Sequence, residues 1–92
     1  MVLTRVEIED FDKFWATFST RGAEKRKEHG SRGARVFRDA EDANRVYVLF
    51  DWDPADFERF MQDPEAPEIM ASAGLKGRPE RTFVEPAGEL DS

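Results

Sequence analysis

Apolar and polar residues alternate from residue 2 to residue 8, with the period of two that is typical of a β-strand. Apolar residues then recur at i, i+3, i+4 and i+7 within residues 11–18, which is the spacing along one face of a helix. Asp10 is the candidate N-cap of this helix, and Gly30 is the candidate for its end. Gly22 predicts a bend in the helix or a close approach of another part of the backbone.

Residues 32–39 and 45–52 are rich in β-branched and aromatic residues and flank a short polar stretch, which predicts an antiparallel hairpin. If Asp39 pairs with Arg45, one face of the hairpin carries Ala34, Val36, Val46, Val48, Phe50 and Trp52. The other face carries Arg35, Phe37, Tyr47, Leu49 and Asp51. Because both faces are partly apolar, we expect the second face to be covered as well.

The remaining chain predicts a second helical region and a last strand. Asp53 and Pro54 supply a cap and a first-turn proline, and the prolines of residues 63–67 divide this region into two short helices that end at Gly74. Residues 75–79 are predicted to form a loop and residues 80–86 a strand, with Phe83 on one face and Thr82 on the other. Residues 87–92 are predicted to be a solvated tail.

The resulting order, β-α-β-β-α-β, predicts an α+β protein with the ferredoxin-like fold over residues 1–86, as a single domain. Both helical regions would cover one face of a four-stranded antiparallel sheet. The open face, with its mixture of apolar and polar residues, predicts a homodimer in which two sheets face each other. The expected interface consists of Arg35, Phe37, Tyr47, Leu49, Asp51 and Phe83.

Charge and composition argue against two classes of partner, nucleic acids and membranes. The net charge of −6 argues against nucleic acid, because phosphate binding depends on clustered Lys and Arg. The densest basic run, residues 21–35, contains two glutamates and is more typical of a solvated helix end than of an anion site. No apolar run approaches the length of a membrane span, and the sequence has no cysteine, so we expect a soluble protein of the cytoplasm that has no membrane partner.

Two stretches of the chain resemble a known family. The strand "VYVLFDW" with the following "PADFERFMQDPE", and "EHGSRGARVFRD" before the hairpin, are similar to the antibiotic biosynthesis monooxygenase-like group of the dimeric α+β barrel superfamily. The resemblance implies a homodimer that forms an α+β barrel, with a cavity in each subunit between sheet and helices. In family enzymes this cavity holds a polycyclic aromatic substrate or, in one branch, haem, and a tryptophan at the position of Trp52 lines it.

The resemblance also bears on cofactors. The haem-degrading branch has a histidine nine or ten residues after this tryptophan, where the present sequence has Met61 and Gln62. Haem ligation of that kind is therefore not expected. A single histidine without clustered carboxylates is also weak evidence for a metal site. We expect no cofactor and no metal.

Seven residues are the candidates for a site. Trp52 is a cavity wall, a residue that takes part directly in catalysis, or core packing. His29 is either an acid or base at the mouth of the cavity or a residue that interacts with the last carbonyls of its helix. Thr4 and Thr82 are either groups that orient a ligand or ordinary strand residues. Phe50, Phe60 and Met61 are the candidate apolar wall.

Three functions remain open on the sequence alone. The first is a cofactor-independent monooxygenase or cyclase acting on an apolar aromatic small molecule, in which the substrate supplies the reactivity. The second is a non-catalytic homodimeric module that binds a small apolar ligand. The third is a structural dimer whose interior is filled by its own side chains.

Overall fold

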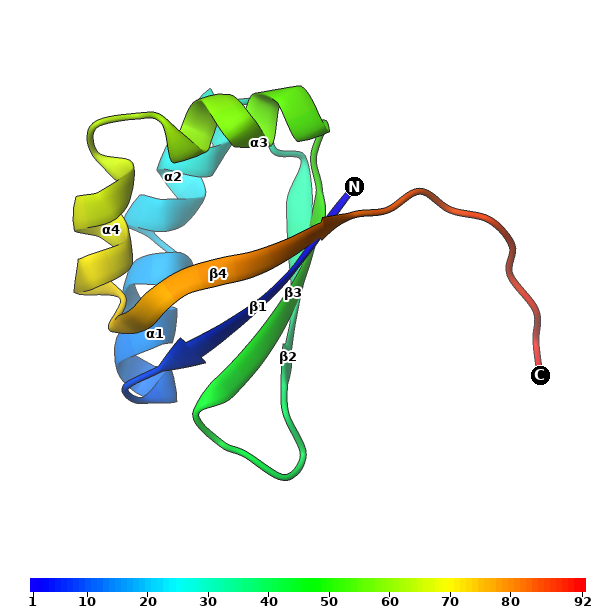
Figure 1. Ribbon diagram of the computed structural model, residues 1–92, viewed down its shortest axis with the longest axis horizontal. Helices are drawn as coiled ribbons and strands as arrows, with labels where there is room; N and C mark the ends of the chain where they lie inside the picture. Colours follow the sequence, from blue (N-terminus) through cyan, green and yellow to red (C-terminus); the bar gives the residue numbers. More distant parts are fainter.

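In the computed structural model, which describes residues 1–92, four antiparallel strands form one sheet in the order β2-β3-β1-β4. The strands are β1 (Val2–Ile8), β2 (Gly33–Arg38), β3 (Arg45–Asp51) and β4 (Leu75–Phe83). All four helices lie on one side of this sheet, and the other side is uncovered (Figure 1). The predicted ferredoxin-like α+β fold is therefore confirmed.

The first helical region consists of two helices, α1 (Phe11–Phe18) and α2 (Arg21–Glu28). The predicted cap is present, because the Asp10 side chain accepts a hydrogen bond from the backbone N–H of Lys13. The prediction for Gly22 is also confirmed: it lies just after the break between the helices, and a Cβ there would stand 3.1 Å from the Thr17 carbonyl oxygen. Gly30, with φ of 89°, follows the end of α2.

The second helical region is divided as predicted, into α3 (Pro54–Met61) and α4 (Ala66–Ser72). Asp53 caps α3 by accepting a hydrogen bond from the Ala55 N–H, and Pro54 occupies the first turn, where its missing N–H costs nothing. Asp63 accepts a hydrogen bond from the Glu65 N–H in the turn that joins the two helices. None of the four helices has the length and the apolar character that crossing a membrane requires.

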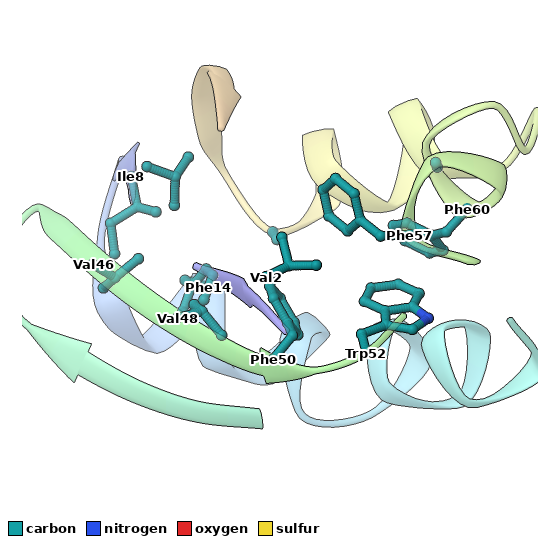
Figure 2. Close-up of a cluster of buried hydrophobic side chains, with 12 residues drawn as sticks. Val2, Ile8, Phe14, Val46, Val48, Phe50, Trp52, Phe57 and Phe60 are labelled. Carbon is teal, nitrogen blue, oxygen red and sulfur yellow. The ribbon is translucent and has the colours of Figure 1, made fainter. Parts of the chain in front are cut away.

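The register of the hairpin is the predicted one. The Asp39 N–H donates to the Arg45 carbonyl, and Arg35 lies opposite Leu49. Val46, Val48 and Phe50 point towards the helices and belong to the buried core, together with Trp52 just beyond the strand (Figure 2). The alternation of β3 thus places its apolar residues against the helices and the side chains of Tyr47 and Leu49 on the open face.

The last strand differs from the prediction in two respects. Residues 75–79 are not a loop but the first half of β4, which pairs with the end of β1 through Leu75 and Ile8. A bulge then shifts the register, at a glycine with φ of 86° (Gly77) and a proline that lacks a ladder donor. Beyond β4 the Val84 N–H still donates to the Met1 carbonyl, and residues 85–92 are exposed and extend away from the domain (Figure 1).

The bulge also reverses the predicted faces of β4. Phe83 lies opposite Val2 and approaches the ring of Phe57, so it stands on the helix side of the sheet. Thr82 lies opposite Leu3 and is exposed on the open face. Thr82 was predicted for the cavity and Phe83 for the dimer interface, and both placements are wrong. The stretch from 80 to 86 has no clear apolar face, so its pattern does not fix the register.

Candidate functional site

An apolar cavity of about 80 Å³ lies between the sheet and the four helices. Thirteen of its seventeen lining residues are hydrophobic. The other four are Thr4, Gly22, Arg26 and Pro79. No carboxylate and no histidine is among the lining residues, and Arg26 is the only ionisable residue of this wall.

Five of the seven predicted site residues line this cavity, namely Trp52, Thr4, Phe50, Phe60 and Met61. Thr4 comes from β1 and Phe50 from β3, because the alternation of both strands directs these side chains towards the helices. Phe60 and Met61 come from the last turn of α3. Thr82 and His29 do not line it, Thr82 because it stands on the opposite face of the sheet.

Trp52 is completely buried and is both a packing residue and a wall of the cavity. Its ring lies 5.4 Å from the ring of Phe57, edge to face, and 5.2 Å from that of Phe60. Figure 2 shows the three side chains beside one another. Its indole N–H donates to the carbonyl oxygen of His29 at 2.9 Å. This hydrogen bond ties the end of β3 to the end of α2, so the indole presents to the cavity only its apolar surface.

His29 occupies a structural position at the end of α2. Its Nε2 lies 2.9 Å from Asp63 Oδ2, and its ring meets the edge of the Phe60 ring. Lys25 lies 3.4 Å from the same carboxylate and also pairs with Glu65. The Glu65 N–H and the His29 side chain together hold the pKa of Asp63 at about 2, well below its usual range. These contacts join α2 to the α3–α4 turn and leave the imidazole outside the cavity.

Arg26 is the residue that sequence reasoning missed. It lies within the basic run expected to be a solvated helix end, yet only 9% of its surface is exposed. Its guanidinium carbon lies 3.8 Å from the centre of the Phe18 ring and 5.7 Å from that of Phe50. Position 26 faces the sheet because it is four residues after buried Gly22, a spacing that brings both onto one side of α2. The four-residue spacing from Gly22 was the signal in the sequence that could have indicated the burial of Arg26.

No family model matches the chain, and no curated protein matches it either. Solved structures do match. SnoaB, a cofactor-independent oxygenase from Streptomyces nogalater, shares 17% identity at a TM-score of 0.75, over 99% of this chain and 95% of its own. A putative antibiotic biosynthesis monooxygenase from Bordetella bronchiseptica shares 15% identity at a TM-score of 0.75, over 94% of both chains.

A third similar structure is a monooxygenase from the gene ActVA-Orf6 of Streptomyces coelicolor, in complex with the ligand nanaomycin D. It shares 17% identity at a TM-score of 0.67, over 97% of this chain and 88% of its own. The chain therefore has the fold of the antibiotic biosynthesis monooxygenases along nearly its whole length, as the resemblance in sequence implied.

Proposed function

We propose that this protein is a small cofactor-independent monooxygenase that acts on a single electron-rich aromatic ring. The observation that carries the proposal is the apolar cavity between sheet and helices, with the buried indole of Trp52 in its wall. The monooxygenase fold supports it. Such a wall excludes water and positions a ring. In the proposed cofactor-independent reaction the substrate ring is the electron donor.

The proposed reaction converts a phenol into a quinone with molecular oxygen. One oxygen atom forms the new carbonyl group on the ring, and the other leaves as water together with the hydroxyl proton and the hydrogen of the attacked carbon. The ring gives up four electrons, which O₂ accepts. The chain's part in this reaction is to bind the ring among Trp52, Phe50 and Phe60 and to place the Thr4 hydroxyl beside it.

The size of the cavity limits the substrate. A cavity of about 150 Å³ accommodates benzene, and the present one is about 80 Å³. The polycyclic molecule that the resemblance implied does not fit inside it as it stands. A single ring enters when the flexible side chains of Met61 and Met70 move, since both line the cavity and are partly exposed.

Oxygen uptake with a panel of phenols and dihydroxybenzenes tests the proposal. We expect oxygen consumption that depends on the protein, with one atom of ¹⁸O₂ in the product and one in water. Ala73→Leu, which places a larger side chain in the cavity just after α4, should abolish it, whereas Ala71→Leu at an exposed position of α4 should not. His29→Gln should retain activity, because this side chain lies outside the cavity. If Ala73→Leu leaves the rate of oxygen uptake unchanged, the assignment of the site to this cavity is contradicted.

A non-catalytic ligand-binding module is the second candidate, favoured by the absence of any acid or base other than Arg26 from the cavity wall. It predicts that aromatic molecules quench the fluorescence of Trp52 without any oxygen uptake. Both candidates place the ligand in the same cavity, and the oxygen electrode separates them.

A further inference from the structure

Arg26 is a buried cation without a counterion. The guanidinium makes one hydrogen bond, from Nη2 to the Phe18 carbonyl oxygen at 3.0 Å, out of the five that it is able to donate. None of the ion pairs of the chain includes it, although its neighbours Lys25 and Arg32 both pair with carboxylates. A charged side chain in such surroundings is rare unless it is paired, because burial removes its hydration.

The fold makes room for this side chain. Gly22 precedes it by one turn, and a Cβ at position 22 would stand 3.0 Å from Nη1 of Arg26. The ring of Phe18 supports the guanidinium at 3.8 Å. Arg26 is one of the residues that line the cavity. Arg26 also lines a surface groove between α2 and β2, whose lining includes Lys27 and Arg32 but no carboxylate.

Burial lowers the pKa of Arg26 to about 10, because the apolar surroundings disfavour the charged form. The group is nevertheless charged at neutral pH, so the folded protein holds an uncompensated positive charge at the rim of an apolar space. An anionic oxygen from outside the chain would compensate it. The Thr4 hydroxyl is the only other polar side-chain group in the cavity wall that can hydrogen-bond to a bound molecule.

We propose that Arg26 binds an anionic oxygen carried by the aromatic ring, so that the site selects phenolates or aromatic carboxylates over neutral rings of the same shape. This inference rests on the proposed function, since it assigns the substrate class of the same cavity. A guanidinium donates to an anionic oxygen through charge-assisted hydrogen bonds, about twice as strong as neutral ones. The ring would lie among the aromatic side chains, and its charged end would face α2.

A matched pair of probes tests the proposal. Benzoate and benzamide have nearly the same shape, and only benzoate carries a charge. Titrations would follow the fluorescence of Trp52 in a Trp15→Phe protein, where no other tryptophan contributes. We expect benzoate to bind about 10- to 100-fold more tightly than benzamide, the range expected for hydrogen bonds to a charged group. A third titration with 4-nitrophenolate tells whether a phenolate oxygen or a carboxylate is preferred.

Variants at position 26 identify the residue responsible. Arg26→Gln and Arg26→Met should reduce the preference for benzoate to about one, and Arg26→Lys should keep part of it. Lys27→Gln, which removes an exposed cation next in the sequence, should leave the preference unchanged. Circular dichroism spectra of all four variants establish that they are folded, and Arg26→Lys provides the second test if Arg26→Gln does not fold.

The outcomes separate this inference from the proposed function. Equal binding of benzoate and benzamide, or a preference that survives in Arg26→Gln, would overturn the role of Arg26 and leave the cavity as a site for neutral rings. A preference for benzoate without oxygen uptake from any phenol would support Arg26 and overturn the monooxygenase. Failure of all the probes to bind would overturn both.

Discussion

At the scale of single residues, Trp52 and Arg26 have opposite effects on the stability of the folded protein. Trp52 is buried among aromatic rings and its one polar atom has a partner, so its two roles do not conflict. Arg26 is buried with most of its donors unused, and the cation–π contact with Phe18 is the one interaction besides a single hydrogen bond that compensates its charge. A residue that weakens the folded state while bordering a cavity is the kind of residue that function explains.

Arg26→Met should therefore raise the stability of the protein. The lowered pKa of Arg26 means that folding disfavours its charged form, a cost that is present at every pH below about 10. Removing it should stabilise by about 1–3 kcal/mol, reduced by the lost hydrogen bond to the Phe18 carbonyl oxygen and the lost cation–π contact with the Phe18 ring. Thermal unfolding at neutral pH measures the effect as a rise of several degrees in Tm. A fall in Tm would show that the guanidinium is a net structural support.

Trp52→Phe should destabilise the protein by about 1–3 kcal/mol, because it leaves the His29 carbonyl oxygen without its buried donor. The matched control is Trp15→Phe. Trp15 is 46% exposed, and its replacement should cost about 1 kcal/mol or less. Urea unfolding of both variants measures the difference. Equal effects would mean that the hydrogen bond between β3 and α2 contributes nothing.

At the scale of elements, the helical regions were predicted closely because the residues that begin and end a helix act locally. Asp10, Asp53 and Pro54 act on the backbone within one turn, and Gly30 ends α2 with a positive φ. The last strand was predicted poorly because its register depends on β1, a partner far away in the sequence. Pairing with β1 turned residues 75–79 from an expected loop into half of β4 and exchanged the faces of Thr82 and Phe83.

The α3–α4 turn should give the protein a measurable sensitivity to acid. The pKa of Asp63 is about 2 in the folded state because the Glu65 N–H and His29 hydrogen-bond to its carboxylate. A carboxyl whose folded pKa is depressed adds stability above its unfolded pKa, and that stability is lost as pH falls through the folded value. Unfolding measurements should therefore show a loss between about pH 4 and pH 2.

Asp63→Asn should flatten this part of the pH profile and lower stability at neutral pH, since the amide keeps an acceptor for the Glu65 N–H but not the charge. Asp91→Asn, in the exposed tail, is the control and should leave the profile unchanged. A profile that is just as steep in Asp63→Asn would assign the acid sensitivity to other carboxylates.

At the scale of the whole molecule, the open face of the sheet is the remaining surface to explain. Leu3 is 38% and Phe37 46% exposed there, with Tyr47 and Leu49 partly exposed between them. The edges of this face carry ion pairs within the chain, including Arg32 with Asp51. Arg35 and Asp51 were both expected in the dimer interface; within the chain the Asp51 carboxylate pairs with Arg32, and the Arg35 guanidinium lies over the Phe37 ring.

We propose that this face forms a homodimer, as the apolar patch suggests. Light scattering should then give twice the 10.6 kDa mass of the chain. Phe37→Asp should produce the monomer, because a carboxylate within an apolar interface is costly to bury. Leu90→Asp, at an exposed position of the tail, should remain a dimer. A monomeric mass for the unmodified protein at working concentration would refute the dimer.

The sequence by itself determined the order of elements, the hairpin register and the set of residues that share a face with Phe50 and Trp52, because alternation and capping act over a few residues. That this face points towards the helices was implied by the family resemblance. Tertiary structure alone decided the faces of β4, the exclusion of His29 from the cavity and the burial of Arg26. Each of these depends on contacts between distant segments. Whether a charge in a basic run meets water or an aromatic ring is set by the packing of α2 on the sheet, which local composition does not encode.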